Sequence, residues 1–275
     1  MIKIFSLASN RPDFIALQLY SFRKYLKEDF EFVVFNNSKF SAGCDEFYDA
    51  IHEQGKQLGI SIIDIPKDQN LIDRCQAIEL QVRLFNPDGR YSVANVAGAY
   101  PLAWAWENII SKERGPIAYL DSDIFLIQPI KLTDSLNSHV ICGIPDGRIH
   151  ADGRCFRYIW STFFLIDMAR LPDPETMVWW CGRIEGVPVD GGGQTYHYFQ
   201  AHPDLDVGYI KQSHYCWLEE SEWKSLDFQP PNYDEFYLND VTILHYRSGS
   251  NWDGKTKEYH AKKTEWLKRR IEEGK

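Results

Sequence analysis

The chain has 275 residues, of which 44% are hydrophobic and 25% are charged, a composition that excludes fibrous and intrinsically disordered proteins. Asp and Glu outnumber Lys and Arg by 39 to 30, so the formal net charge is −9. This acidity excludes a general nucleic-acid binder, because a phosphate backbone attracts a basic face. Aromatic residues make up 15% of the chain, which suits either a large aromatic core or surfaces that stack on bases or sugars.

The first residues and the cysteines bear on the compartment. The apolar run from Met1 to Ala8 is too short for a signal peptide and predicts a strand instead. No stretch reaches the ~18 apolar residues that a membrane span needs. Six cysteines occur without a CxxC pair or the spacing of a zinc site. We therefore expect reduced thiols and a cytoplasmic protein without a membrane span.

The first 130 residues alternate strand and helix patterns. Short apolar runs predict strands, and apolar residues spaced by three or four predict helices. Pro12 suits the first position of a helix, and Gly115-Pro116 ends another. In chain order the pattern predicts a strand at 2–8, a helix from 12 that carries Ile15, Leu19, Phe22 and Leu26, a strand at 31–36, a helix at 45–58, a strand at 60–65, a helix that carries Leu71, Cys75, Ile78, Val82 and Phe85, a helix at about 96–112 and a strand at 117–120.

Strands separated by helices in this way form βαβ units with a mainly parallel sheet. Ligands of such sheets bind beyond the carboxyl ends of the strands. Three polar segments follow predicted strands, at 9–11, 36–37 and 121–123. We therefore expect these three segments to share one edge of the sheet.

After residue 130 the alternation is less regular. Apolar runs predict strands at 140–143 and 158–166, and the second is apolar enough to be central. A glycine run at 191–193 precedes a predicted helix at 195–201, a strand is predicted at 241–245, and a charged helix at 256–272. No repeat or linker interrupts the chain. We predict one continuous α/β domain, 1–275, divided into 1–130, 131–255 and a C-terminal helix within 256–275.

The segment Asp121-Ser122-Asp123 is the most specific feature of the sequence. Apolar residues precede and follow it, so both carboxylates lie at the end of a buried strand. Two like charges held together are costly unless a cation neutralises them. Carboxylate oxygens are the ligands that hard divalent cations prefer. Asp121 and Asp123 therefore predict a metal site, although an exposed turn would also explain a bare DxD tripeptide.

The stretch 119–127 resembles the DxD segment of glycosyltransferases with the GT-A fold. That resemblance implies a mainly parallel, Rossmann-like half that binds a nucleotide sugar, a mixed half that binds the acceptor, and Mn²⁺ or Mg²⁺ held against the donor diphosphate. The resemblance covers most of residues 1–255. UDP is our guess, from the family, for the nucleotide of the donor. The residues implied to bind the nucleotide sugar are Ser9, Asn10, Arg11, Asn36, Asn37 and Ser122.

The late segment His245-Tyr-Arg-Ser-Gly249 is similar to the His-x-x-x-Gly segment that supplies a third metal ligand in several GT-A families, but it lacks their Lys-Pro before Trp252. His245 is either that ligand or a hydrogen-bonded core histidine. Arg247, Ser248 and Ser250 could donate to diphosphate oxygens or form an exposed turn. Residues 160–162 stand where the family places a strand that faces the donor sugar. The resemblance therefore implies that Trp160 and Ser161 contact the substrate. For Trp160 the alternative is a place in the core.

An inverting transfer needs a carboxylate other than the metal ligands to take the acceptor proton. Asp190 is our candidate, because the three glycines after it would let a substrate approach closely. Gly192 and Gln194 of the same loop are candidate substrate contacts, and a plain turn capped by Asp190 is the alternative. Three other carboxylates compete for the role of base, namely Asp146, Asp152 and Asp167.

The sequence thus predicts a glycosyltransferase, moving a hexose or pentose to a hydroxyl of a glycan or small acceptor. One alternative is a haloacid-dehalogenase-like phosphohydrolase, which also has Asp-x-Asp after an apolar strand but usually a Thr where Phe125 stands. A non-catalytic sugar-binding protein is the other alternative.

Overall fold

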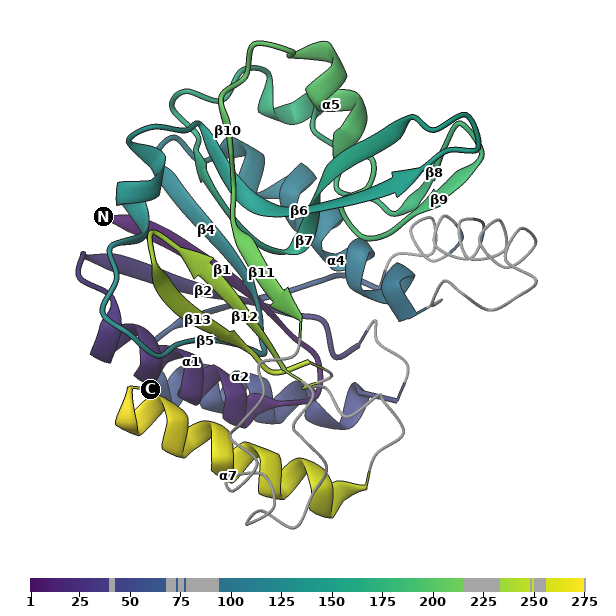
Figure 1. Ribbon diagram of the computed structural model, residues 1–275. Coiled ribbons are helices and arrows are strands. Elements are labelled where there is room, and N and C mark those ends of the chain that lie inside the picture. The colour runs from purple at the N-terminus through teal and green to yellow at the C-terminus, as the bar shows by residue number, and fades with distance from the viewer. Residues whose placement is uncertain are drawn as a thin grey trace.

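A computed structural model of the chain describes residues 1–39, 43–67, 73, 77, 94–214, 233–247, 249 and 256–274. The helical stripe predicted from Leu71 to Phe85 lies outside these residues. Most of the other predicted elements are present (Figure 1), and those at 2–8, 195–201 and 241–245 have the predicted bounds. The helix expected at 45–58 begins with a 3₁₀ turn, Asp45–Phe47, before α2, Tyr48–Leu58.

A seven-stranded sheet with the order β10-β6-β7-β4-β1-β2-β3 forms the centre of the molecule. The four strands from the first half of the chain run parallel, β7 is antiparallel to both of its neighbours, and β10 is parallel to β6. The predicted mixed α/β fold with a mainly parallel sheet is therefore confirmed. The strands are β1 Ile2–Ala8, β2 Phe30–Asn36, β3 Ser61–Asp64, β4 Pro116–Asp121, β6 Ile141–Ile149, β7 Cys155–Asp167 and β10 Val207–Tyr209.

Both faces of this sheet are covered, which explains why its strands are nearly continuous apolar runs. Alternate residues of β1 and β2 enter two separate cores. On one face α1, Pro12–Tyr25, packs through its stripe of apolar side chains. On the other face α4, Ala94–Asn108, contributes Tyr100 and Trp106 to an aromatic core with Trp179 and Phe164.

A second, four-stranded sheet joins distant parts of the chain. Its order is β11-β12-β13-β5, and all its pairs are antiparallel. Because β5 directly follows β4, the late strands come to lie beside the end of β4. The remaining strands and helices are β5 Ile124–Leu126, β8 Gly182–Ile184, β9 Val187–Val189, α5 Thr195–Ala201, β11 Lys211–His214, β12 Asp234–Leu238, β13 Val241–His245 and α7 Lys257–Glu273.

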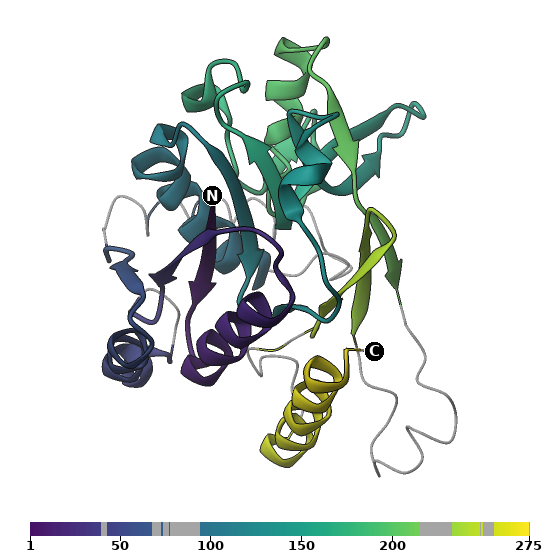
Figure 2. The same cartoon turned by 90° about the vertical axis from the view of Figure 1, so that its left-hand side faces the viewer.

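The C-terminal helix α7 packs against α1, as Figures 1 and 2 both show. The Tyr25 hydroxyl donates to the carbonyl of Ile271, and Lys24 donates to the carbonyl of Glu272. Trp266 and Ile271 of this helix are both buried. The end of the chain is thereby fixed to the element that follows the first strand.

Candidate functional site

The three polar segments predicted to share an edge do so. In the register of the sheet, Ala8 lies opposite Asn36, and Leu7 lies opposite Asp121. The chain therefore leaves β1, β2 and β4 at the same carboxyl edge, with Asp121 at the end of β4, the central strand of the seven. This edge is the place where open α/β sheets bind their ligands.

The turn between Asp121 and Asp123 is held by a buried glutamine that the sequence analysis did not identify. Gln18 of α1 donates from Nε2 to the carbonyl oxygens of Asp121 and Ile124, at 2.8 and 3.0 Å. Its own oxygen accepts the Ser6 hydroxyl of β1. A polar residue on the apolar face of a predicted helix was the available signal, since buried polar groups need partners.

His245 is brought to Asp123 by strand pairing. In the β13–β5 ladder His245 lies opposite Ile124, the residue after Asp123. Its Nε2 is 3.5 Å from Asp123 Oδ1, and both side chains are buried. Gly249 donates its backbone N–H to Asp123 Oδ2 at 3.1 Å. The close approach requires a glycine, because a Cβ on Gly249 would lie 2.5 Å from the Asp123 Cβ.

Asp234 on β12 is a further member of this cluster that sequence reasoning missed. It lies directly opposite His245, its side chain is 0% exposed, and its Oδ2 is 3.1 Å from His245 Nδ1. Arg247 Nε lies 3.5 Å from the same oxygen. Phe236 stacks on the imidazole and Trp160 meets its edge, with centroids 5.3 and 6.0 Å away. The ring is therefore fixed with Nε2 toward Asp123.

Burial and repulsion by Asp123 raise the pKa of Asp121 to about 7. Burial alone would lower the pKa of His245, but the neighbouring carboxylates of Asp123 and Asp234 raise it to about 9. The imidazole therefore carries a proton at neutral pH and provides positive charge beside Asp123. Tyr119 donates its hydroxyl to Asp121 Oδ1 at 3.2 Å.

The chemistry of Asp121, Asp123 and His245 fits a divalent cation. Two carboxylates and an imidazole suit Mn²⁺, and a hydrogen bond from Nδ1 to a carboxylate is the usual support of a metal-binding histidine. Among the residues that the structure describes, no three His, Cys, Asp or Glu side chains are arranged to hold a metal ion. His245 and Asp123 face each other directly instead.

Two residues expected to bind the nucleotide have their polar groups engaged within the protein. The Arg11 guanidinium bonds to Asp13, to the carbonyl of Gly249 and to the Thr264 hydroxyl, and it stacks on Phe14. Arg11 thus ties the late loop and α7 to the start of α1. The buried Asn36 amide accepts from Ser38 and donates to Asp64.

The other residues expected at this edge lie close to it. Asn37 donates its backbone N–H to Ala8 and its amide to the Ser9 hydroxyl, which joins the ends of β1 and β2. Asn10 follows Ser9 in the turn before α1, and Ser122 lies in the turn between β4 and β5. Ser248 and Ser250 lie outside the described residues.

Strand β7 bulges beside this cluster. Four residues of β7, 160–163, lie opposite a single residue of β6, Ile144. The paired residues on either side are Gly143 with Phe164 and Pro145 with Ile159. Bulges are frequent next to active sites, where they redirect side chains. Here the bulge places Trp160 against the His245 ring. The Thr162 side chain hydrogen-bonds to Asp121.

The loop that contains Asp190 is packed onto this bulge. The Ser161 N–H donates to the Gly191 carbonyl, and a Cβ on Gly191 would lie 2.4 Å from the Ser161 hydroxyl. Gly192 has φ +81°, and a Cβ there would lie 2.2 Å from the Ile159 carbonyl. The glycines therefore allow close packing on β7, a different reason from the substrate approach that the sequence suggested. Gln194 donates to the Arg183 carbonyl.

Asp190 belongs to a second group of carboxylates. The Tyr158 hydroxyl donates to Asp146 Oδ2 at 2.6 Å and lies 3.2 Å from the Asp190 nitrogen, which donates to it. Arg148 pairs with Asp146 at 2.6 Å. Burial raises the pKa of Asp190, and the charge of Asp146 adds to the rise.

Two competing carboxylates are placed elsewhere. Asp152 forms an exposed ion pair with Arg154 in the β6–β7 turn. Asp167 lies opposite Pro116, at the other end of β4 from Asp121, and caps the turn that contains Arg170. Within the described residues, no helix is long and apolar enough to cross a membrane.

No family model matches the sequence, and no curated protein sequence matches it. Solved structures that match in fold include three glycosyltransferases. Mouse xyloside xylosyltransferase 1 is 12% identical, with 76% of this chain and 85% of that chain covered and a TM-score of 0.41. The S. cerevisiae mannosyltransferase Ktr4p is 11% identical, with 64% and 58% covered and a TM-score of 0.42.

The galactosyltransferase LgtC, solved with donor and acceptor sugar analogues, is 14% identical, with 99% and 95% covered and a TM-score of 0.44. All three matches are glycosyltransferases, the class of enzyme that the DxD segment resembles. The likeness to these three structures concerns the fold alone.

Proposed function

We propose that the protein is a metal-dependent glycosyltransferase that moves a sugar from a nucleoside diphosphate sugar, with UDP as the expected nucleotide, to a hydroxyl of a glycan or small acceptor. The observation that supports this most is the cluster of Asp121, Asp123 and His245, with Asp234 behind the histidine. Strand pairing assembles it from the middle and the late part of the chain at the carboxyl edge of β4.

Asp121, Asp123 and His245 would hold Mn²⁺ or Mg²⁺. The cation supplies a Lewis acid that neutralises the charge on the departing diphosphate. Asp234 keeps the His245 ring in place, and the Gly249 N–H keeps the Asp123 carboxylate in place. Arg247, which follows β13, is the candidate donor to the diphosphate, together with Ser248 and Ser250.

Asp190 is the proposed base for an inverting transfer. Burial raises the pKa of Asp190, which makes its carboxylate a better proton acceptor than an exposed aspartate. Trp160 and Ser161 lie between its loop and the DxD cluster, where the donor sugar would bind. Asp190 would bind sugar hydroxyls in place of acting as a base if the enzyme retains configuration.

The two alternatives fit the cluster less well. In a haloacid-dehalogenase-like enzyme, the first Asp is a nucleophile and a Thr usually stands where Phe125 is. Phe125 is fully buried in β5 and packs on Phe14, so it has no access to a ligand. A non-catalytic sugar-binding protein would not require a pair of carboxylates held so close that the pKa of Asp121 is raised.

The test is a thermal-shift panel of nucleotide sugars with and without Mn²⁺, followed by incubation with the stabilising donor. We expect UDP or a UDP-sugar to raise the melting temperature only when Mn²⁺ is present, and the donor to be slowly hydrolysed. Stabilisation by phosphorylated sugars instead, with release of phosphate, would favour the phosphohydrolase. Binding without any turnover of the donor would favour the non-catalytic protein.

A further inference from the structure

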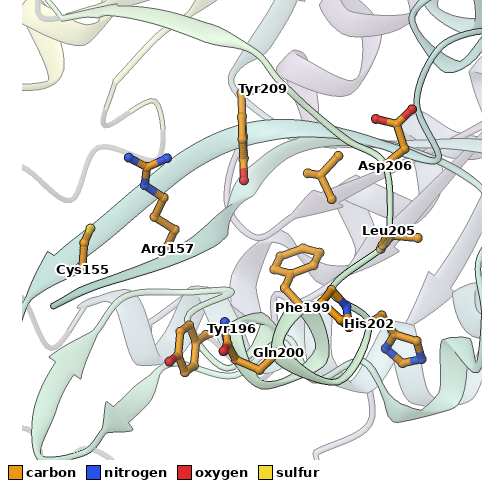
Figure 3. Close-up of a pocket in the computed structure, with 11 residues that line it drawn as sticks. Cys155, Arg157, Tyr196, Phe199, Gln200, His202, Leu205, Asp206 and Tyr209 are labelled. Atoms are coloured by element: carbon orange, nitrogen blue, oxygen red, sulfur yellow. The ribbon is translucent and has the colours of Figure 1, made fainter.

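A groove separate from the DxD cluster lies between α5, the outer end of β7 and the edge strand β10 (Figure 3), with a volume of about 500 Å³. That volume is in the range of small-ligand sites. Tyr209 extends from β10 into the space above α5, and Phe199 extends from α5 toward it. Arg157 flanks the groove from β7. None of these residues takes part in the function proposed above.

The polar side chains of the groove have capacity to bind a ligand. Among the described residues, the side chains of Arg157 and Gln200 form no hydrogen bond or ion pair with the rest of the protein. Arg157 offers five N–H donors, and Gln200 offers both donors and an acceptor. Tyr209 is 54% exposed, which is unusual for a large aromatic residue on an edge strand. Val207, two residues earlier, lines the same groove.

This combination matches the chemistry of a sugar ring. A pyranose presents an apolar face of C–H groups, which stacks on an aromatic ring, and a rim of hydroxyls, which both donate and accept hydrogen bonds. Arg157 brings a positive charge to the lining, and the Asp206 carboxylate lies 2.9 Å from His139 Nδ1, so the groove suits a neutral or an anionic sugar. The net charge of −9 disfavours nucleic acid.

The groove is connected to the proposed reaction centre by α5. Thr195, the first residue of the helix, bonds to the Gly192 carbonyl in the loop that contains Asp190. Phe199 and Gln200, near the end of the helix, line the groove. Phe199 and Gln200 follow Thr195 by four and five residues, a rise of about 6 to 8 Å along the helix. A ligand that reaches from Asp190 to the groove is therefore longer than one sugar unit.

We infer that this groove binds a remote part of the acceptor and that the acceptor is an oligosaccharide rather than a small molecule. The inference rests on the proposed glycosyl transfer. Contacts to a part of the substrate that does not react supply binding energy that positions the reacting end.

The experiment is a glycan array, with neutral and uronate-bearing oligosaccharides, probed with the full chain in the presence of Mn²⁺ and UDP. Affinity for the best oligosaccharide is then measured by calorimetry for the wild type, Tyr209→Ala and Arg157→Ala. Tyr20→Ala is the matched control, because Tyr20 is 45% exposed on α1, far along the chain from the groove.

We expect Tyr209→Ala to weaken oligosaccharide binding about tenfold, the size of one lost stacking contact, and Arg157→Ala to weaken it by a similar factor. Tyr20→Ala should bind as the wild type does, and all variants should bind UDP with Mn²⁺ normally. Oligosaccharide binding that is unchanged in Tyr209→Ala would overturn the inference, and so would an array on which no oligosaccharide binds. Failure of the wild type to bind UDP with Mn²⁺ would count against the proposed function instead.

Discussion

The described part of the chain contains two partly buried carboxylate clusters, and they are neutralised in different ways. In the first, Asp121 and Asp123 face His245, a cation that can lose its charge. In the second, Asp146 faces Arg148, which is charged at every relevant pH, and Asp190 lies beside them. A permanent cation leaves no place for a metal ion, whereas a histidine can exchange its proton for one. The first cluster therefore suits the departing diphosphate and the second suits the acceptor hydroxyl.

The largest expected effect comes from removing the first pair of carboxylates. Asp121→Ala and Asp123→Ala should each abolish metal-dependent UDP binding and lower transfer about 10³-fold or more, because several kcal/mol of charge stabilisation are lost. Calorimetry of UDP binding with and without Mn²⁺ measures the effect. Asp134→Ala, at an exposed carboxylate, is the control. Unchanged Mn²⁺ dependence in both variants would falsify the assignment of the metal site.

In the second cluster, Asp190→Asn should lower turnover about 10²- to 10⁴-fold while donor binding is retained, because the amide cannot accept the acceptor proton. Donor affinity and initial rates are measured side by side, and NMR of the product gives its anomeric configuration. Near-normal turnover, or a product that retains configuration, would remove Asp190 from the role of base. Asp152→Asn, in the exposed turn, is the control and should leave both quantities unchanged.

The sequence predicts the first cluster only in part. The DxD pair follows an apolar strand, a local pattern, and the shared edge with residues 9–11 and 36–37 follows from the rules of parallel sheets. Asp234 and Gln18 were not predicted, because their roles depend on a cross-strand pair and a helix contact between residues far apart in the sequence. We expected Arg11 and Asn36 to bind the nucleotide, but in the structure their side chains hydrogen-bond to other residues of the protein.

Asp234→Asn tests whether the support of His245 matters for the metal. An amide can keep a hydrogen bond to Nδ1 but does not carry the charge that raises the basicity of the ring. Replacing the group that hydrogen-bonds to the second ring nitrogen of a metal-binding histidine typically weakens metal binding about 10- to 100-fold. Mn²⁺ affinity is measured by electron paramagnetic resonance, and ¹⁵N NMR reports the protonation of the His245 ring. Wild-type affinity together with an unchanged ring spectrum would contradict this role.

Protons and metal should compete in the first cluster and not in the second. In the metal-free protein Asp121, with a pKa of about 7, and His245, with a pKa of about 9, hold protons at lower pH. Metal binding must release these protons, so affinity rises with pH. Between pH 6 and 8 we expect Mn²⁺ affinity to increase at least about tenfold. Titrations in buffers of different ionisation enthalpy count the protons released, and a count of zero would refute the competition.

The smallest expected effects come from replacing one glycine beside each cluster. These variants also separate the roles of the two clusters best. Gly249→Ala places a Cβ 2.5 Å from the Asp123 Cβ and 2.8 Å from the Phe14 ring, neither of which can rotate away. We expect a stability loss of about 1–3 kcal/mol and UDP–Mn²⁺ binding weakened several-fold, because Asp123 must shift.

Gly191→Ala instead meets the Ser161 hydroxyl at 2.4 Å, and it should lower turnover more than donor binding, because the Asp190 loop is displaced. Gly115→Ala has no atom within 4 Å of the new Cβ and serves as the control for both. Melting temperature, UDP affinity and turnover are measured for all three variants. If Gly249→Ala and Gly191→Ala reduced donor binding and turnover in the same proportion, the two clusters would act as one site, and the division between a leaving-group side and an acceptor side would have to be abandoned.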